Sequence, residues 1–259
     1  MALDLIIVLF LIGFIGSFIS GMVGIGGSVI KYPLLLYVPP LLGVGLFTAA
    51  EVAGLSAIQV FFATIGGVWA FRKGGYLNKS LILTMGISVL VGSFIGGFGS
   101  RFVADDMINL IYGVMAVLAT IMMFLPQKRV EETVSGKIDF NRPIAITSAF
   151  IIGVSAGIVG AGGAFLLVPI MLVILKIPTR VTIASSLAIT FLSSIGSTIG
   201  KVVTGQILYA PAIVLIVASL IAAPLGANAG KKMNTKILQS ILSILILVTA
   251  IKIWFDIIG

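Results

Sequence analysis

The chain has 259 residues, of which 59% are hydrophobic and 9% are charged, and its mean hydropathy is +1.27. Soluble domains carry about 25% charged residues, so this composition excludes a soluble globular protein and indicates a polytopic membrane protein. The chain has no cysteine and no histidine, which excludes disulfides, thiol chemistry, zinc-type ligand clusters and a histidine base. We therefore expect a protein that is not an enzyme and that binds no cofactor and no metal.

Ten apolar segments are predicted in chain order. The first half places them at 4–22, 27–39, 43–71, 81–100 and 107–126. The second half places them at 143–160, 163–177, 181–203, 209–229 and 236–257. Two of them, 27–39 and 163–177, are shorter than the ~20 residues that a membrane helix needs. Each is either a short helix that completes a broken span or a re-entrant piece, which a membrane tolerates where protein or water satisfies the backbone.

The sequence contains one glycine-rich motif twice. Residues 21–27 read GMVGIGG and residues 157–163 read GIVGAGG, and each copy is followed by a proline, Pro33 or Pro169. Positions 21 and 157, like positions 33 and 169, are 136 residues apart. We infer a duplication with a first transmembrane repeat at 1–126, a polar cytoplasmic linker at 127–142 and a second transmembrane repeat at 143–259.

The formal net charge of +8 is read as a topology signal, because most basic residues lie in short loops. If each half crosses the membrane five times, the halves are inverted, and all but three of the 16 basic residues fall on the cytoplasmic side. Lys31 counts as cytoplasmic in this scheme; the three exceptions are Arg101, Lys201 and Lys252. We therefore predict an all-α membrane protein of two inverted five-segment repeats, with both termini extracytoplasmic and no nucleic-acid partner.

The two glycine breaks are the first candidate binding site. Glycine lets the backbone approach a ligand closely, and a helix that starts after the break directs unpaired N–H groups and partial positive charge toward an anion. Paired breaks in two halves indicate a transporter's substrate site. The candidate residues are Gly24, Gly26, Gly27, Gly160, Gly162 and Gly163. The alternative is close helix packing, which we expect for Gly13, Gly16, Gly92, Gly96 and Gly226.

Polar side chains behind each break form a second candidate group: Ser28, Ser56 and Gln59 in the first half, and Ser185, Ser186, Thr190 and Ser193 in the second. Ser186, Thr190, Ser193 and Ser197 share one helical face. This face could line an aqueous path or donate hydrogen bonds to an oxyanion. The alternative is ordinary hydrogen bonding between helices, which is modest in strength.

Glu51 is the candidate for proton coupling, because it lies inside the apolar segment 43–71. An ionisable group within a membrane segment is costly and is a functional hypothesis by default. The alternatives are a carboxyl near the outer headgroups or one that is hydrogen-bonded between helices.

These motifs resemble one family of membrane permeases, the sulfite exporter TauE/SafE family. The resemblance is carried by the duplicated G-x-x-G-x-G-G-x5-P pattern, by ASSLAI at 184–189 and by the basic-glycine turn RKGGYL at 72–77. It implies transport of sulfur-containing anions, with the glycines of both breaks, Ser185 and Ser186 at the site. The first half departs from the pattern, since Ala49, Ala50 and Glu51 stand where the second half has Ser185, Ser186 and Leu187. An ionised Glu51 would repel an anion unless it is protonated when the anion binds.

The sequence thus predicts a plasma-membrane transporter that moves a small sulfur-containing anion, such as sulfite, thiosulfate or an organosulfonate, by alternating access. No ATP-binding loop is present, so we expect coupling to a proton or Na⁺ gradient. The expected partners are the anionic solute and the lipid bilayer. The alternatives are a non-transporting assembly or structural protein and a passive anion channel.

Overall fold

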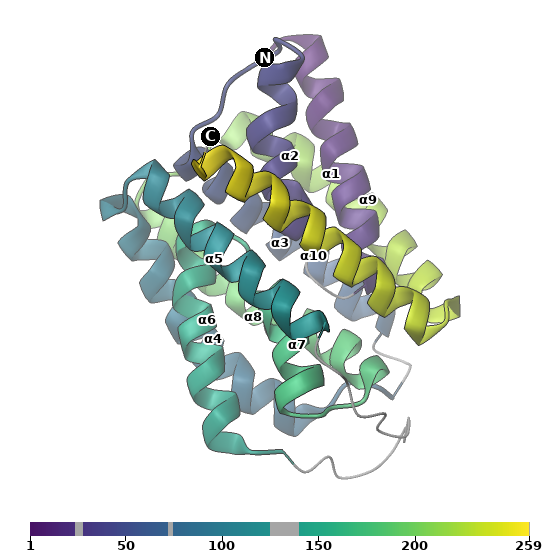
Figure 1. Ribbon diagram of the computed structural model, residues 1–259. Coiled ribbons are helices and arrows are strands. Elements are labelled where there is room, and N and C mark those ends of the chain that lie inside the picture. The colour runs from purple at the N-terminus through teal and green to yellow at the C-terminus, as the bar shows by residue number, and fades with distance from the viewer. Residues whose placement is uncertain (24–27, 72–74, 125–139, 259) are drawn as a thin grey trace.

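The computed structural model describes residues 1–23, 28–71, 75–124 and 140–258 (Figure 1), and the regular secondary structure of this described part is all helical, without strands. Its α-helices are α1 (Leu3–Val23), α2 (Ser28–Leu41), α3 (Ala49–Phe71), α4 (Lys79–Gly99), α5 (Asp105–Phe124), α6 (Arg142–Val159), α7 (Ala164–Pro169), α8 (Thr179–Val203), α9 (Tyr209–Lys232) and α10 (Thr235–Ile258). A 3₁₀ turn, Ser100–Phe102, follows α4, and a π-helical turn, Ile170–Ile174, follows α7. Seven helices of this part are long and apolar enough to cross a membrane.

The all-α membrane fold expected from the sequence is confirmed, and most segment bounds agree within two residues. The two short segments are helical but short, as α2 has 14 residues and α7 has six. A clear difference is at 43–71, where the helix begins only at Ala49. Residues before Ala49 form a turn and an extended stretch, so the N-terminus of α3 lies further along the chain than hydropathy indicated.

Side-chain caps define several helix ends. Asn78 Oδ1 accepts a hydrogen bond from the Leu81 backbone N–H (2.9 Å) at the start of α4. Asn141 Oδ1 accepts one from the Ile144 N–H (3.2 Å) at the start of α6, where Pro143 also favours a helix start. These caps satisfy N–H groups that would otherwise lack partners.

Glycine faces join helices from opposite halves of the chain. Gly226 of α9 lies against the Phe18 carbonyl of α1, and Gly230 lies one turn later against Met22, so α1 and α9 run in the same direction. In the same way Gly96 of α4 faces Val154 of α6, and these two helices are also parallel. A side chain at these glycines would overlap the facing backbone, as expected for close membrane helix packing.

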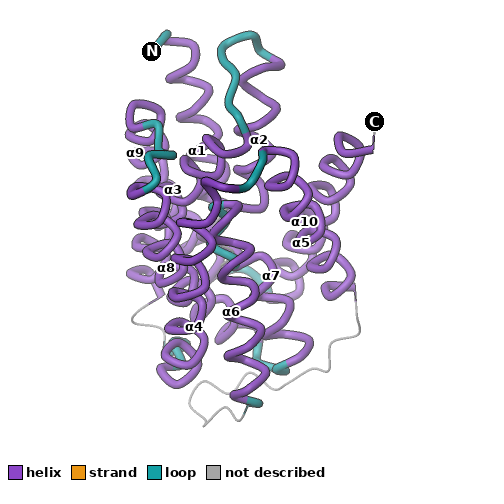
Figure 2. The backbone as a smooth tube through the Cα atoms, turned by 90° about the vertical axis from the view of Figure 1, so that its left-hand side faces the viewer, coloured by secondary structure: helices purple, strands orange, loops and turns teal. Residues whose placement is uncertain are grey.

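Helices α3 and α8 cross at the centre in opposite directions. Phe61 and Phe191, near the two helix midpoints, stack with ring centroids 5.4 Å apart, and Gly67 meets Leu187 further along. Helices α1, α3 and α9 therefore run one way, and α4, α6 and α8 run the other. Both chain ends lie toward the same end of the molecule (Figure 2). Two inverted repeats require such directions, and we keep the inverted arrangement as a proposal.

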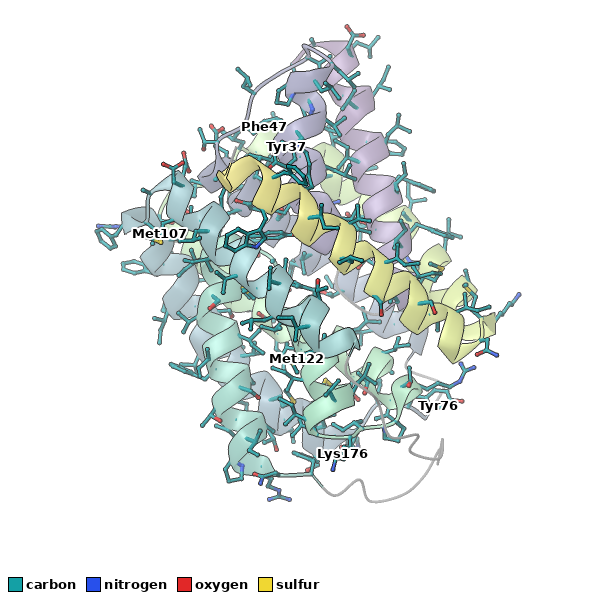
Figure 3. The ribbon with its side chains drawn as sticks, viewed as in Figure 1. Tyr37, Phe47, Tyr76, Met107, Met122 and Lys176 are labelled. Carbon is teal, nitrogen blue, oxygen red and sulfur yellow. The ribbon has the colours of Figure 1, made fainter. Side chains whose placement is uncertain are left out.

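Helices α5 and α10 lie side by side across one face of this bundle (Figure 1). They contact the short helices α7 and α2, respectively. Figure 3 shows Tyr37 of α2 beside α10, and Lys252 Nζ of α10 lies 4.5 Å from the centroid of this ring. The short helices are thereby held between the central helices and this outer pair.

Candidate functional site

The second glycine break has the backbone conformation that its sequence predicts. Helix α6 ends at Gly160, which has a φ of 73°, and Gly162 and Gly163 have φ values of 63° and 70°. This left-handed region is costly for residues with a Cβ atom. Gly160 also lies against the Ala53 carbonyl of α3, which leaves no room for a side chain. The break is therefore a rigid turn packed directly on α3.

Gly162 lies between the middles of α3 and α8. A Cβ atom at Gly162 would be 2.8 Å from Thr190 Cγ2 of α8 and 2.8 Å from Val60 Cγ1 of α3. Thr190 and Val60 are close to the midpoints of their helices. The second break thus meets α3 and α8 near their midpoints, with Thr190 beside it.

Several buried polar atoms on α3 and α8 lack protein partners. Four atoms of the predicted site residues have no hydrogen-bond partner among the described residues: Ser56 Oγ, Gln59 Oε1, Thr190 Oγ1 and Ser193 Oγ. All four side chains are fully buried. Leaving a buried polar group unsatisfied costs about 1–3 kcal/mol, so a group of them is explained best by a ligand or water that the site accepts.

The other end of the Gln59 amide is held in place by α1. Gln59 Nε2 donates to the Gly13 carbonyl and to Ser17 Oγ, both at 3.4 Å, and Ser17 Oγ donates to Ser219 Oγ of α9 at 2.8 Å. This chain of contacts fixes the Gln59 side chain and leaves its Oε1 atom free to meet a ligand. Helices α1, α3 and α9 therefore share one polar contact beside the site.

The remaining predicted serines have protein partners. Ser185 Oγ accepts from the Asn78 N–H (3.1 Å) and lies 3.5 Å from the Tyr76 carbonyl, so it fastens the α3–α4 connection to α8. Ser186 Oγ donates to the Ile183 carbonyl (3.0 Å), and Ser197 Oγ reaches the Gly157 carbonyl at 3.4 Å. Ser185 and Ser197 therefore form hydrogen bonds between segments, as the alternative interpretation expects. Substrate binding stays the hypothesis for Thr190 and Ser193.

The first break falls outside the described residues. Gly24, Gly26 and Gly27 lie there, and so does the side chain of Ser28, although Ser28 begins α2. Their place in the site stays a prediction.

Comparison with known proteins identifies the family. The model of the Sulfite exporter TauE/SafE family matches residues 9–253. The chain belongs to this family. Curated relatives of the TauE/SafE chain include the probable membrane transporter protein YunE of Bacillus subtilis, 23% identical and covering 96% of this chain and 97% of the relative. A probable membrane transporter protein of Methanocaldococcus jannaschii is 25% identical and covers 91% of this chain and 90% of the relative. No solved structure matches the chain significantly.

Glu51 in this TauE/SafE chain belongs to a helix cap. Glu51 Oε2 accepts from the Thr48 N–H (2.9 Å), and Thr48 Oγ1 accepts from the Glu51 N–H (3.2 Å). This reciprocal pair is a capping box at the start of α3. Asp105 Oδ1 accepts from the Ala50 N–H (2.8 Å) at the same helix end. Glu51 thus lies in the first turn of α3, and its proposed proton-coupling role stays a prediction.

Two lysines correct the sequence-based assignment of charges. Lys31 and Lys201, which the topology count treated as loop charges, are both fully buried in helices of the TauE/SafE bundle. Lys201 Nζ donates to Ser100 Oγ (3.1 Å), the Ile158 carbonyl (3.0 Å) and Gln206 Oε1 (3.1 Å). The count assigned Lys31 to the cytoplasmic side and Lys201 to the outer side, and hydropathy averaged over a segment cannot show that a lysine is enclosed. The sequence signal was available, because Lys31 lies within the predicted segment 27–39.

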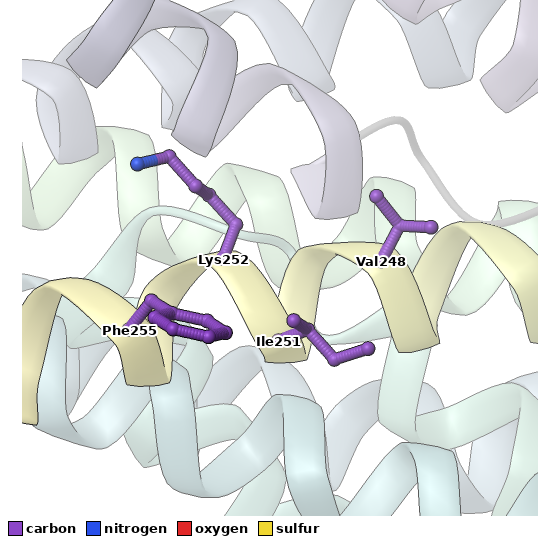
Figure 4. Close-up of a pocket in the computed structure, with 4 residues that line it drawn as sticks. All are labelled: Val248, Ile251, Lys252 and Phe255. Atoms are coloured by element: carbon purple, nitrogen blue, oxygen red, sulfur yellow. The ribbon is translucent and has the colours of Figure 1, made fainter.

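A pocket on the outer side of α10 is a weaker candidate. Val248, Ile251, Lys252 and Phe255 line it (Figure 4). Its apolar residues are exposed, which suits contact with lipid in a membrane protein of the TauE/SafE family. Lys252 already lies over the Tyr37 ring. We therefore place the candidate site at the α3–α8 crossing.

Proposed function

We propose that this TauE/SafE chain transports a small sulfur-containing anion, such as sulfite, thiosulfate or an organosulfonate, across the plasma membrane. The observation that carries this proposal is the set of unpartnered buried polar atoms on α3 and α8, of which Thr190 lies beside Gly162. The description of the family and the names of its relatives support transport. The sulfur-containing substrate rests on the family description.

The chemistry of the site suits an oxyanion. The hydroxyls of Ser56, Thr190 and Ser193 can rotate to donate hydrogen bonds to sulfite or sulfonate oxygens. Gln59 is held by α1 through Nε2, so its free Oε1 atom would accept a hydrogen bond from a protonated oxygen of the anion. Hydrogen bonds to a charged acceptor are stronger than neutral ones. An anion would therefore satisfy several of these groups at once.

The helix directions support alternating access. The site lies where α3 crosses α8, and these two helices run in opposite directions. Helix α3 packs with α1 and α9, which run in its direction, and α8 packs with α4 and α6, which run in the other. Rocking of one set against the other would open the crossing alternately to the two sides, as in transporters with inverted repeats. We place both termini outside the cytoplasm by the positive-inside rule. A proton or Na⁺ gradient drives transport in this proposal.

Thr190→Val tests the proposal with little disturbance of the fold. Valine keeps the shape of threonine and removes a hydroxyl that has no partner among the described residues. We expect unchanged or slightly higher thermal stability without ligand, together with a roughly 10-fold weaker anion affinity, which is the loss of about one hydrogen bond. The matched control is Thr64→Val, because Thr64 Oγ1 already donates to the Val60 carbonyl of its own helix (2.8 Å).

The measurement is thermal stabilisation of the purified protein by sulfite, thiosulfate, methanesulfonate, taurine, sulfoacetate, acetate and chloride, followed by flux of the stabilising anion in proteoliposomes. A ligand of the native state raises the unfolding free energy by RT ln(1 + [L]/Kd). Stabilisation by sulfur oxyanions that is weakened in Thr190→Val supports the proposal. A wild-type protein that no anion stabilises and that moves none would favour a non-transporting role. If the anion crosses the membrane but an imposed proton or Na⁺ gradient does not make it accumulate, the protein is a passive channel.

A further inference from the structure

Lys31 is a buried lysine without a counter-charge. It lies in the first turn of α2 with 0% of its surface exposed, and its Nζ atom has no hydrogen-bond partner among the residues that the structure describes. Helix α2 contains no acidic residue, and α1, against which Lys31 packs, has only Asp4, in its first turn. Lys31 is therefore enclosed in the bundle with its charge unmatched.

Gly16 of α1 makes room for this side chain. A Cβ atom at Gly16 would overlap Lys31 Cγ and would lie 3.0 Å from Lys31 Cε. Sequence reasoning had assigned Gly16 to helix–helix packing, but its neighbour is the lysine stem. The stem therefore runs across the face of α1 near the middle of that helix.

The same face of α1 holds the Gln59 amide of the candidate site. A Cβ atom at Gly13 would be 3.3 Å from Gln59 Nε2. Residues three apart on a helix have Cβ positions about 5–6 Å apart, so the lysine stem and the Gln59 amide contact neighbouring positions on α1. Lys31 thereby lies beside the Gln59 amide of the candidate site.

An isolated charge in this position is expensive. Transfer of an ammonium group from water into a protein interior costs several kcal/mol unless a partner compensates it. Ionisable groups inside membrane proteins accordingly mark substrate and ion pathways. An anion bound beside the Gln59 amide would provide the missing negative charge.

We propose that Lys31 is the cationic residue of the substrate site and neutralises the sulfonate or sulfite group of the transported anion. This inference rests on the proposed function and deepens it, because it assigns the charge recognition to one residue outside both glycine motifs. A single ammonium with several hydroxyl donors balances one negative charge. The site therefore favours a singly charged sulfur oxyanion, such as methanesulfonate or hydrogen sulfite, over doubly charged sulfate.

Lys31→Met tests the inference by thermal stabilisation with methanesulfonate, sulfite and sulfate. We expect the dissociation constant of methanesulfonate and sulfite to rise at least ~30-fold, the effect of removing one partner of a buried charge pair. The midpoint without ligand should stay the same or rise, because the variant removes an unmatched charge. The control is Lys252→Met, which also removes one positive charge but at the α10 surface, and which should bind as the wild type does.

The outcomes separate the two proposals. If the wild type responds to the sulfur oxyanions and Lys31→Met responds with equal affinity, the role of Lys31 is refuted and the transport proposal stands. If the wild type responds to none of them in stability or flux, both proposals fail. Should Lys31→Met not fold, Gly16→Ala keeps the lysine but fills the space of its stem, and unchanged affinity in that variant would also overturn the inference.

Discussion

The two buried lysines of this protein differ in their surroundings. Lys201 Nζ donates three hydrogen bonds, to Ser100, Ile158 and Gln206, whereas Lys31 Nζ makes none within the described chain. Both have 0% of their surface exposed. Burial alone therefore does not indicate function in a membrane protein. A charge whose donors are satisfied by the fold is structural, and a charge left unmatched beside other unmatched polar groups indicates a ligand.

Lys201 holds together segments from both halves of the chain. Its partners belong to the 3₁₀ turn after α4, to the end of α6 and to the turn between α8 and α9. Ser100 Oγ also donates to Gln206 Oε1 (2.9 Å), which closes the group into a network. Lys31, in contrast, touches α1 through its apolar stem. The contrast predicts opposite consequences for stability and binding.

The largest effect on stability is expected for Lys201→Met. The variant removes three hydrogen bonds from a buried network and takes the Lys201 donor from the Ile158 carbonyl, so we expect a loss of about 3–5 kcal/mol in the free energy of unfolding. At about 2–4 °C per kcal/mol for a protein near this size, the midpoint should fall by roughly 6–20 °C. Thermal unfolding in detergent measures it, and anion affinity of the folded fraction should be kept. An unchanged midpoint would contradict the structural role of Lys201.

A smaller effect, confined to binding, is expected for Gly16→Ala. The added methyl overlaps the Lys31 stem, so the stem must shift and its ammonium is displaced. We expect anion affinity to fall about 10-fold, which corresponds to ~1.4 kcal/mol. Titration of the stabilising anion against thermal unfolding measures the change. Gly99→Ala is the control, since a Cβ atom at Gly99 meets nothing within 4 Å. If Gly16→Ala and Gly99→Ala changed the anion affinity equally, Lys31 would have no role in binding and would not differ from Lys201 in this respect.

The smallest effect on stability is expected for Glu51→Gln. Glutamine also completes a capping box with Thr48, so the unfolding free energy should change by less than ~1 kcal/mol. The proton-coupling role of Glu51 is tested by measuring anion accumulation driven by a pH gradient in proteoliposomes. Wild-type accumulation would restrict Glu51 to helix capping. If the variant loses this accumulation but still exchanges anion across the membrane, proton coupling by Glu51 is supported. Glu51 would then join the two buried lysines as an ionisable group with a third role.

Hydropathy and glycine spacing predicted much of this fold. The apolar runs locate the helices closely, because membrane helices must be long and apolar, and the repeated glycine motif located the break that the structure describes at Gly160 and Gly163. The start of α3 was missed because its cap, formed by Thr48 and Glu51, follows an apolar loop that hydropathy cannot distinguish from helix.

The site was predicted only in part. Helical periodicity grouped Thr190 with Ser193, and the structure leaves both hydroxyls unpartnered, but the same pattern included Ser197, which contacts α6. Spacing shows which residues share a face and not which atoms of another helix face them. Lys31 was missed as a site residue because it was counted among the basic residues that set the orientation of the protein in the membrane. The rule applied to Glu51, that an ionisable residue within an apolar segment suggests function, applied to Lys31 as well.

The pairing of α1 with α9 also has a consequence for synthesis of the chain. Gly226 of α9 provides the close contact for Phe18 of α1, so the first helix made can form this contact only when the ninth helix is complete. At about 5–20 residues per second of translation, this delay lasts roughly 10–40 s. During that time the small-residue surface of α1 faces lipid or an insertion factor. The first half of the protein therefore reaches the bilayer well before it can adopt its final packing.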